Sequence, residues 1–132
     1  RMDKPFVALG RLYLDFDAEK EAEQVLAECV RANEGSAECY NLHGVALKAL
    51  KRYEQAVSEF KKALDIDNGL FDALYNCGMT YAEWYEESHA NEQKQQARDY
   101  LQKFVATGGG KDGSAFGFVR AASDKLYALS GP

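Results

Sequence analysis

The fold is decided by residues 37–70, which read AECYNLHGVALKALKRYEQAVSEFKKALDIDNGL. Small and apolar residues recur here at helical spacing: Tyr40, Gly44 and Leu47 in the first half, and Ala56, Phe60 and Ala63 in the second. Glycine on one helix and alanine on the other remove side-chain bulk where two antiparallel helices cross, so that large neighbours can fill the gap. The stretch therefore predicts a helix–turn–helix unit.

The same pattern recurs on both sides of this stretch, because Gly10, Gly44 and Gly78 are 34 residues apart. A step of this length is typical of helical repeats. The third copy resumes late, since Ala56 and Ala97 are 41 residues apart, which is 34 plus an insertion of seven. We therefore expect three hairpins, at residues 3–36, 37–70 and 71–107, with the insertion in the third.

This register resembles that of the tetratricopeptide repeat (TPR) family over about residues 3–107. The resemblance implies an all-α fold: one domain over residues 1–132, built as a right-handed solenoid of TPR-type hairpins with about seven helices. Three positions depart from the family pattern, namely Cys29 at a small position, Glu34 where proline is common, and Phe104 at a usual alanine.

The C-terminal part of the chain predicts a cap on the repeats. A Gly-rich loop at residues 108–113 ends the last hairpin. Residues 114–129 then carry Phe116, Val119, Ser123, Leu126 and Leu129 at helical spacing. Since stacked repeats leave their last apolar face open, this segment is expected to be a capping helix.

Composition excludes several classes of protein. The 16 Lys and Arg against 21 Asp and Glu give a net charge of −5, which disfavours binding to nucleic acid. No apolar run is long enough for membrane insertion. Cys29, Cys39 and Cys77 form no CxxC motif and are interpreted as buried free thiols, which together with the absence of a signal peptide favours the cytoplasm. Because the sequence does not begin with Met, it leaves open whether a leader or further repeats are missing.

The family resemblance implies that the first helix of each hairpin lines a concave groove. The groove positions are Val7, Arg11, Asn41, Leu42, Val45, Lys48, Tyr75, Asn76 and Met79. Amides and Arg can bond the backbone or acidic side chains of a peptide or helix of a partner, while the apolar side chains accept its anchors. Some of these residues could instead pack between adjacent first helices. The alternative function is a self-associating scaffold, a homo-oligomer, or a fragment of a longer TPR array.

One TPR activity is disfavoured when the residues are compared. TPR domains that hold the acidic C-terminal tails of chaperones use a two-carboxylate clamp of Lys, Asn and Arg, and the corresponding places here are Val7, Arg11, Leu42, Asp72 and Asn76. The clamp is absent, and Asp72 would repel a carboxylate.

The insertion of the third hairpin holds a second candidate contact, Trp84 and Tyr85, beside several carboxylates. Its seven residues amount to about two helical turns, which we expect to be shared as one added turn on each helix. These aromatic residues either protrude toward a partner or pack onto the second hairpin or the terminal helix.

Motifs for catalysis are missing from the sequence. His43 lies beside Gly44 at a helix-packing position and is expected to be buried and hydrogen-bonded, whereas His89 is expected in solvent. No HExxH motif supports a metal site. The run from Gly108 to Lys111 lacks the first glycine and the Ser or Thr of a phosphate-binding loop. We therefore expect no enzyme activity, no metal and no cofactor.

Overall fold

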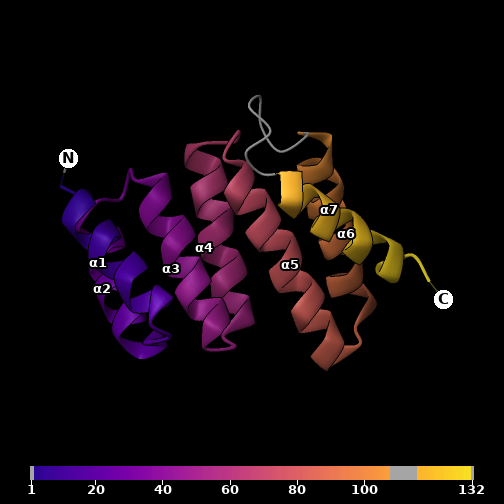
Figure 1. Cartoon of the computed structure of the whole chain (residues 1–132), viewed down its shortest axis with the longest axis horizontal. Helices are drawn as coiled ribbons and strands as arrows, with labels where there is room; N and C mark the ends of the chain where they lie inside the picture. Colours follow the sequence, from indigo (N-terminus) through magenta and orange to yellow (C-terminus); the bar gives the residue numbers. More distant parts are fainter. Residues whose placement is uncertain (1, 108–115, 132) are drawn as a thin grey trace. The chain divides into compact units, whose positions relative to one another are not determined.

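The computed structural model describes residues 2–107 and 116–131, and these residues form seven helices and no strand (Figure 1). The helices are α1 (Lys4–Asp15), α2 (Glu19–Ala32), α3 (Ala37–Ala49), α4 (Tyr53–Ile66), α5 (Phe71–Ser88), α6 (Asn91–Ala106) and α7 (Phe116–Leu129). The predicted all-α fold is confirmed. The Gly-rich loop predicted at 108–113 and the predicted start of the last helix at 114–115 lie outside the described residues.

The chain divides into two compact units, residues 1–70 and residues 71–132. In the first unit α1 packs against α2, α2 against α3, and α3 against both α4 and α1. In the second unit α5 packs against α6, and α7 packs against both of them. Each unit is described below by itself. No helix in the described part of the chain has the length and apolar character that a membrane crossing requires.

Glycines at the repeated positions allow the paired helices to approach closely. A Cβ atom on Gly44 of α3 would lie 2.6 Å from the ring of Phe60 on α4. A Cβ on Gly78 of α5 would lie 2.7 Å from the Leu101 side chain and 3.1 Å from the Leu101 backbone nitrogen on α6. Because Phe60 and Leu101 are fully buried, they fill the space that the missing glycine side chains leave.

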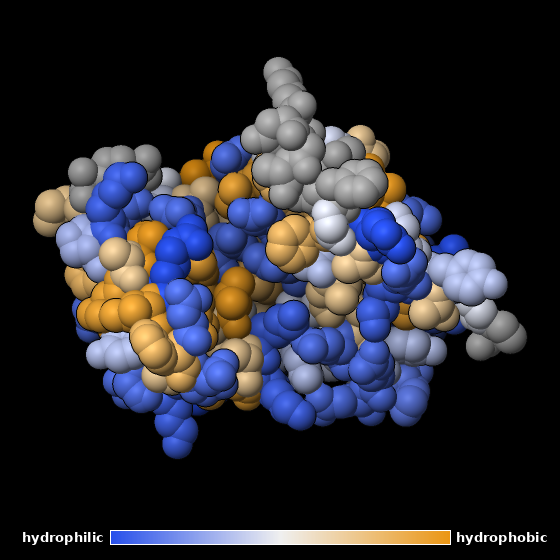
Figure 2. Space-filling view, viewed as in Figure 1, coloured by the Kyte–Doolittle hydropathy of each residue, from blue (hydrophilic) through white to orange (hydrophobic). Residues whose placement is uncertain are grey.

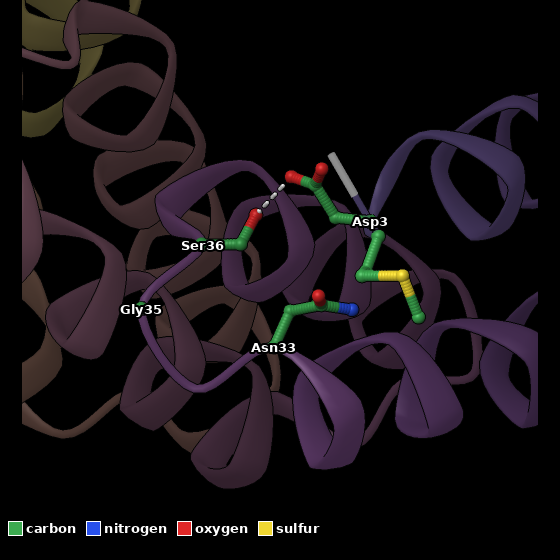
Figure 3. Close-up of a pocket in the computed structure, with 5 residues that line it drawn as sticks. Asp3, Asn33, Gly35 and Ser36 are labelled. Atoms are coloured by element: carbon green, nitrogen blue, oxygen red, sulfur yellow. Dashed lines mark hydrogen bonds between the residues drawn. The ribbon is translucent and has the colours of Figure 1, made fainter.

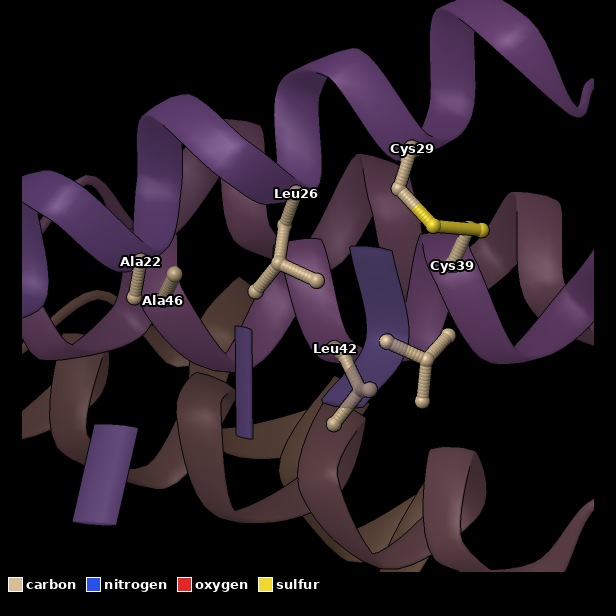
Figure 4. Packing of buried hydrophobic residues seen from close by; sticks show 7 residues of the cluster. Ala22, Leu26, Cys29, Cys39, Leu42 and Ala46 are labelled. Atoms are coloured by element: carbon tan, nitrogen blue, oxygen red, sulfur yellow. A yellow bond between two sulfur atoms is a disulfide. The ribbon is translucent and has the colours of Figure 1, made fainter. Parts of the chain in front are cut away.

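The core of the first unit contains a disulfide bond, which corrects the interpretation of the cysteines as free thiols. Cys29 of α2 is bonded to Cys39 of α3, with Cα atoms 5.6 Å apart (Figure 4). That separation is within the range that a disulfide can span. The two cysteines belong to different repeats, so the register of a single repeat gives no sign that they face each other. The argument for a reducing cytoplasm from these two residues therefore falls away.

Both bonded cysteines are completely buried, within a cluster of small and aliphatic side chains. The cluster consists of Val7, Ala22, Leu26, Cys29, Cys39, Leu42 and Ala46 (Figure 4). Cys77, the third cysteine, is buried in α5 and keeps its thiol.

A polar contact joins the starts of α1 and α3. The Ser36 side chain caps α3 by accepting a hydrogen bond from the Cys39 backbone N–H at 3.1 Å. The Ser36 hydroxyl in turn donates to Asp3 Oδ2 at 2.7 Å, beside a small cavity lined by Asp3, Asn33, Gly35 and Ser36 (Figure 3). Asp3 precedes α1 but makes no side-chain cap there, because its carboxylate is turned to Ser36.

The seven-residue insertion lengthens the two helices of the third hairpin unequally. Helix α5 has 18 residues against 13 in α3, and α6 has 16 against 14 in α4. Counted from the repeated positions, α5 extends five residues further beyond Gly78 than α3 does beyond Gly44, and α6 begins three residues further before Ala97 than α4 does before Ala56, while the turn is one residue shorter. Each helix therefore gains about one turn, as expected. The total of seven is accommodated entirely within the hairpin.

Helix α7 buries a narrow stripe of small and apolar residues against the third hairpin. Ala122 is fully buried and Leu129 nearly so, while Val119 and Leu126 are half-buried. Ser123, which the helical spacing placed on the packed face, is exposed. Val119, Leu126 and Leu129 therefore lie on the packed side of α7 as the spacing predicted, with Ala122 in place of Ser123.

Candidate binding surfaces

The first candidate surface lies on α1 and α3 in the first unit, and we call it the α1–α3 face. It carries Arg11, Val45 and Lys48, of which Arg11 is exposed and the other two are half-buried. The Arg11 guanidinium forms an ion pair with Glu38 of α3 at 2.9 Å, although the Arg11 side chain keeps 56% of its surface exposed. Exposed pairs of this kind contribute little to stability. The pair with Glu38 therefore does not prevent the Arg11 guanidinium from contacting another molecule.

Three other residues predicted for the groove are mostly buried. Val7, Asn41 and Leu42 retain 8%, 7% and 6% of their surface, respectively. Val7 and Leu42 belong to the core cluster of the first unit. Their packing corresponds to the alternative that some groove positions pack between adjacent first helices, and they offer little area to a partner.

The second candidate surface lies on α5 in the second unit, where Tyr75, Asn76 and Met79 are all half-buried. The Tyr75 ring lies between those of Phe104 on α6 and Phe118 on α7, with centroids 5.0 and 5.1 Å away. This burial raises the pKa of the Tyr75 hydroxyl. Tyr75 is therefore held rigidly by aromatic contacts, as a preformed anchor would be.

The aromatic residues of the insertion pack within their own hairpin. Trp84 is half-buried and stacks on Tyr81, with centroids 5.9 Å apart, and Tyr81 stacks in the same way on Tyr100 of α6. Tyr85 lies beside the ring of His89 and under the Lys94 ammonium, which is 5.8 Å from the ring centroid. Both aromatic residues therefore have packing contacts within the second unit, and their contact with a partner stays a prediction.

An apolar strip on and next to α1 is exposed in the first unit. Leu9, Leu12 and Phe16 retain 41%, 50% and 76% of their surface, and Met2 just before the helix retains 77%. Figure 2 shows apolar residues gathered over α1 and α3. Leu9, Leu12 and Phe16 are three and four residues apart, and this spacing in the sequence indicates an apolar stripe along one side of a helix.

His43 is buried on α3 and hydrogen-bonded, as its position beside Gly44 predicted. Its Nε2 lies 2.8 Å from Glu23 Oε2 on α2, and its Nδ1 lies 3.7 Å from Glu59 Oε1 on α4. Burial alone would lower the pKa of His43, but the hydrogen bonds and charges of Glu59 and Glu23 outweigh it and raise the pKa above 6.5. His89 is exposed at the end of α5.

No group of three or more His, Cys, Asp or Glu side chains able to hold a metal ion occurs among the residues with described positions. The residues predicted for the groove lie on α1 and α3 in the first unit and on α5 in the second.

Comparison with known proteins supports the repeat assignment at the level of sequence and of fold. Residues 44–83 match the family model of the TPR repeat. No curated protein matches the sequence.

Solved structures with the same fold have low sequence identity. The Yersinia enterocolitica type III secretion translocator chaperone SycD, in an alternative dimer, has a TM-score of 0.83 at 11% identity, covering 96% of this chain and 90% of SycD. SycD in complex with a peptide of the translocator YopD has a TM-score of 0.79 at 12% identity, with the same coverage. The TPR2B domain of yeast Sti1, in a complex with pHsp70, has a TM-score of 0.73 at 20% identity, covering 98% of each chain.

These identities are too low to carry over a partner, and they show the fold alone. The sequence match lies on α3, α4 and α5, where the register of small and aromatic residues is clearest. The sequence match therefore identifies a TPR repeat at residues 44–83, and the described residues share the helical-hairpin fold of these solved structures.

Proposed function

We propose that this chain is a non-catalytic protein–protein interaction module that binds a peptide or helical segment of a partner protein. The binding residues belong to the first helices of the hairpins: the α1–α3 face in the first unit and the exposed side of α5 in the second. The observation that carries the proposal is the α1–α3 face, where two packed helices carry an accessible guanidinium on α1 and half-buried apolar surface on α3.

The chemistry of the α1–α3 face favours an amphipathic segment with an acidic group. Arg11 can exchange its exposed ion pair with Glu38 for a carboxylate of the partner, because an exposed pair is easily replaced. Val45 supplies apolar surface beside it, and Lys48 adds a second cation at the C-terminal end of α3. Two solved structures of this fold, those of SycD and Sti1, hold a YopD peptide and pHsp70, respectively.

The exposed side of α5 offers different chemistry. Met79 is an adaptable apolar side chain, and Asn76 provides an amide for the backbone of an extended segment. Asp72 is exposed on the same helix, and its carboxylate disfavours an acidic chain terminus at this surface.

Affinity capture from the host tests the proposal, with the wild-type chain, an Arg11→Glu/Met79→Glu double variant and an Arg31→Glu control as baits. Arg31 is exposed on α2, outside both surfaces. We expect prey retained by the wild type and the control to be lost from the double variant. Prey that stay bound to all three baits would contradict the assignment of these surfaces.

The exposed apolar strip on α1 favours a second candidate function, self-association into an oligomer or scaffold. Leu9, Leu12 and Phe16 lie at helical spacing, so they present a continuous apolar stripe that a second copy could cover. Light scattering of the wild type and of Phe16→Asp separates the two functions. Growth of the mass with concentration that Phe16→Asp abolishes favours self-association, and a monomer at high concentration favours the partner-binding module.

A further inference from the structure

The exposed apolar strip of the first unit runs along the whole of α1, and we call it the α1 strip. Its members are exposed and follow one another at alternating steps of three and four residues: Met2, Pro5, Leu9, Leu12 and Phe16. This alternation is the a and d pattern along which two helices pack side by side. The residues that α1 buries in its own unit, Val7 and Gly10, are not part of it. The strip is therefore suited to a second helix that lies alongside α1.

The charged ends of α1 oppose the dipole of the helix. Lys4 is its first residue and Asp15 its last, and both side chains are exposed. Acidic residues stabilise the N-terminal end of a helix and basic residues its C-terminal end, but α1, all of whose residues are described, has neither in these places. A second α1 that runs antiparallel relieves both ends, because it brings its Asp15 to Lys4 and its Lys4 to Asp15.

Lys4 and Asp15 also lie in line with each other along one side of the α1 strip. They are 11 residues apart, which is about three helical turns, or about 16 Å along the axis. In an antiparallel pair of identical helices related by a twofold axis, each side of the strip meets the same side of the other copy. Lys4 of each copy then faces Asp15 of the other, and the contact occurs twice.

We propose that the α1 strip pairs with the α1 strip of a second copy of this chain, with the two helices antiparallel. The apolar side chains form the centre of the contact, and Lys4 of each copy pairs with Asp15 of the other at its two ends. This inference deepens the second candidate function, self-association, and rests on it.

The charges favour this arrangement over a parallel pair. Parallel α1 helices bring the two Lys4 side chains to one end of the contact and the two Asp15 side chains to the other. Like charges then gather at each end and repel, and the end charges of each helix remain opposed to its dipole.

Pairing through the α1 strip leaves the α1–α3 face open. Arg11 is two residues from Leu9, and at about 100° per residue it lies on nearly the opposite side of α1. The Arg11 guanidinium instead contacts Glu38 of α3 in its own copy. The dimer therefore carries the α1–α3 face twice, and self-association does not compete with binding of a partner there.

The test is sedimentation equilibrium of the wild type and of charge variants over a range of concentrations. Lys4→Glu and Asp15→Lys each place like charges opposite each other, and symmetry repeats the change, so we expect each to weaken dimerisation about tenfold. Lys4→Glu/Asp15→Lys restores opposite charges and should dimerise within about threefold of the wild type. Within one chain the two side chains are too far apart to compensate, so this recovery reports the contact between copies.

Two controls match these variants. Lys103→Glu makes the same charge change at an exposed position on α6, in the second unit, and should dimerise like the wild type. Leu9→Asp should abolish the dimer and Ile66→Asp on α4 should not, although Leu9 and Ile66 have similar exposed fractions, 41% and 43%. Circular dichroism confirms that each variant is folded.

Three results would overturn the proposal, and they separate it from the functions proposed above. A wild type that stays monomeric at every concentration removes both the α1 pairing and self-association. A dimer whose double charge variant is as weak as the single variants, or one that Ile66→Asp disrupts as strongly as Leu9→Asp, removes the α1 pairing alone. None of these results bears on the binding of a partner at the α1–α3 face or at α5.

Discussion

His43 shows how one buried side chain can join three helices. It lies on α3, with Glu23 of α2 on one side of its ring and Glu59 of α4 on the other. Burial opposes the charge on the ring, but the two carboxylates outweigh burial and favour the protonated form. The protonated ring therefore holds the second helix of the first hairpin to the second helix of the next.

The raised pKa of His43 predicts a pH-dependent contribution to stability. Because the folded state binds the proton more tightly than the unfolded chain, the stabilisation is complete below the unfolded pKa of 6.5 and is lost as the pH rises through the folded value. In urea unfolding, the stability difference between the wild type and His43→Gln should be larger at about pH 6 than at about pH 9.

The control for this prediction is the Glu23→Gln/Glu59→Gln double variant. It keeps the His43 ring and removes both carboxylates that favour the charge on the ring. In this background, the effect of His43→Gln on the free energy of unfolding should be the same at both pH values, or smaller at low pH. A wild-type difference that is larger at high pH would contradict the assigned role of the two glutamates.

The sequence predicted the environment of His43 in part. Its place beside Gly44 indicated a buried, hydrogen-bonded ring, because that position faces the crossing of two helices. The glutamates could not be assigned as partners, since Glu23 and Glu59 are separated from His43 by 20 and 16 residues and lie on different helices. The same limit applies to the disulfide, because nothing in the spacing of Cys29 and Cys39 reports that α2 and α3 bring them together.

At the level of helix pairs, Gly78 should be essential for the packing of α5 on α6. An added Cβ would lie 3.1 Å from the backbone nitrogen of Leu101, which cannot move away as a flexible side chain could. We expect Gly78→Ala to lower the free energy of unfolding by about 1–2 kcal/mol, since overpacking exceeds the gain in helix propensity. Urea unfolding measures the change.

Gly117 of α7 provides the matched control, because a Cβ there meets nothing within 4 Å. Gly117→Ala should raise the free energy of unfolding by about 0.5–1 kcal/mol through helix propensity alone. If Gly78→Ala is as stabilising as Gly117→Ala, the close crossing of α5 and α6 is not as described.

The disulfide should stabilise the contact between α2 and α3. Cys29 and Cys39 are 10 residues apart, and closing a loop of this length in the unfolded chain is worth about 3 kcal/mol by the chain-entropy estimate. Urea unfolding should therefore show that a reductant lowers the free energy of unfolding of the wild type by an amount of this order. Cys39→Ala should be less stable than the oxidised wild type both with and without the reductant. Under denaturing, non-reducing conditions, thiol titration should detect one thiol. Detection of three thiols would contradict the disulfide between Cys29 and Cys39.

Helix-level features followed from the sequence where they depend on short-range spacing. The hairpin with the insertion was predicted because Ala97, Leu101 and Phe104 repeat the pattern seven residues late. The exact number of residues that each helix gains was not predicted, because it depends on the tip, where His89 adopts a φ of 55° after the last residue of α5. Nothing in the repeat register determines where that turn falls.

For the molecule as a whole, the sequence identified the fold but only part of the exposed surface. The 34-residue step predicted paired helices, and the family match agrees with it. Exposure of individual groove residues depends on side-chain packing against neighbouring helices, which is why Val7 and Leu42 are core residues while Arg11 is accessible. The binding surfaces of both units therefore stay predictions until a partner is measured.

Charge reversal on the first unit alone separates binding at the α1–α3 face from binding elsewhere. Arg11→Glu places a carboxylate beside Glu38 and removes the cation offered to a partner. Arg31→Glu makes the same change on α2, outside both surfaces, and controls for net charge.

The most direct test of the account is isothermal titration calorimetry of the captured partner segment with the wild type, Arg11→Glu and Arg31→Glu. We predict that Arg11→Glu weakens binding about tenfold or more, as expected for the loss of a charged contact in an interface, and that Arg31→Glu leaves the affinity within about twofold of the wild type. Equal affinities for all three proteins would contradict partner binding at the α1–α3 face.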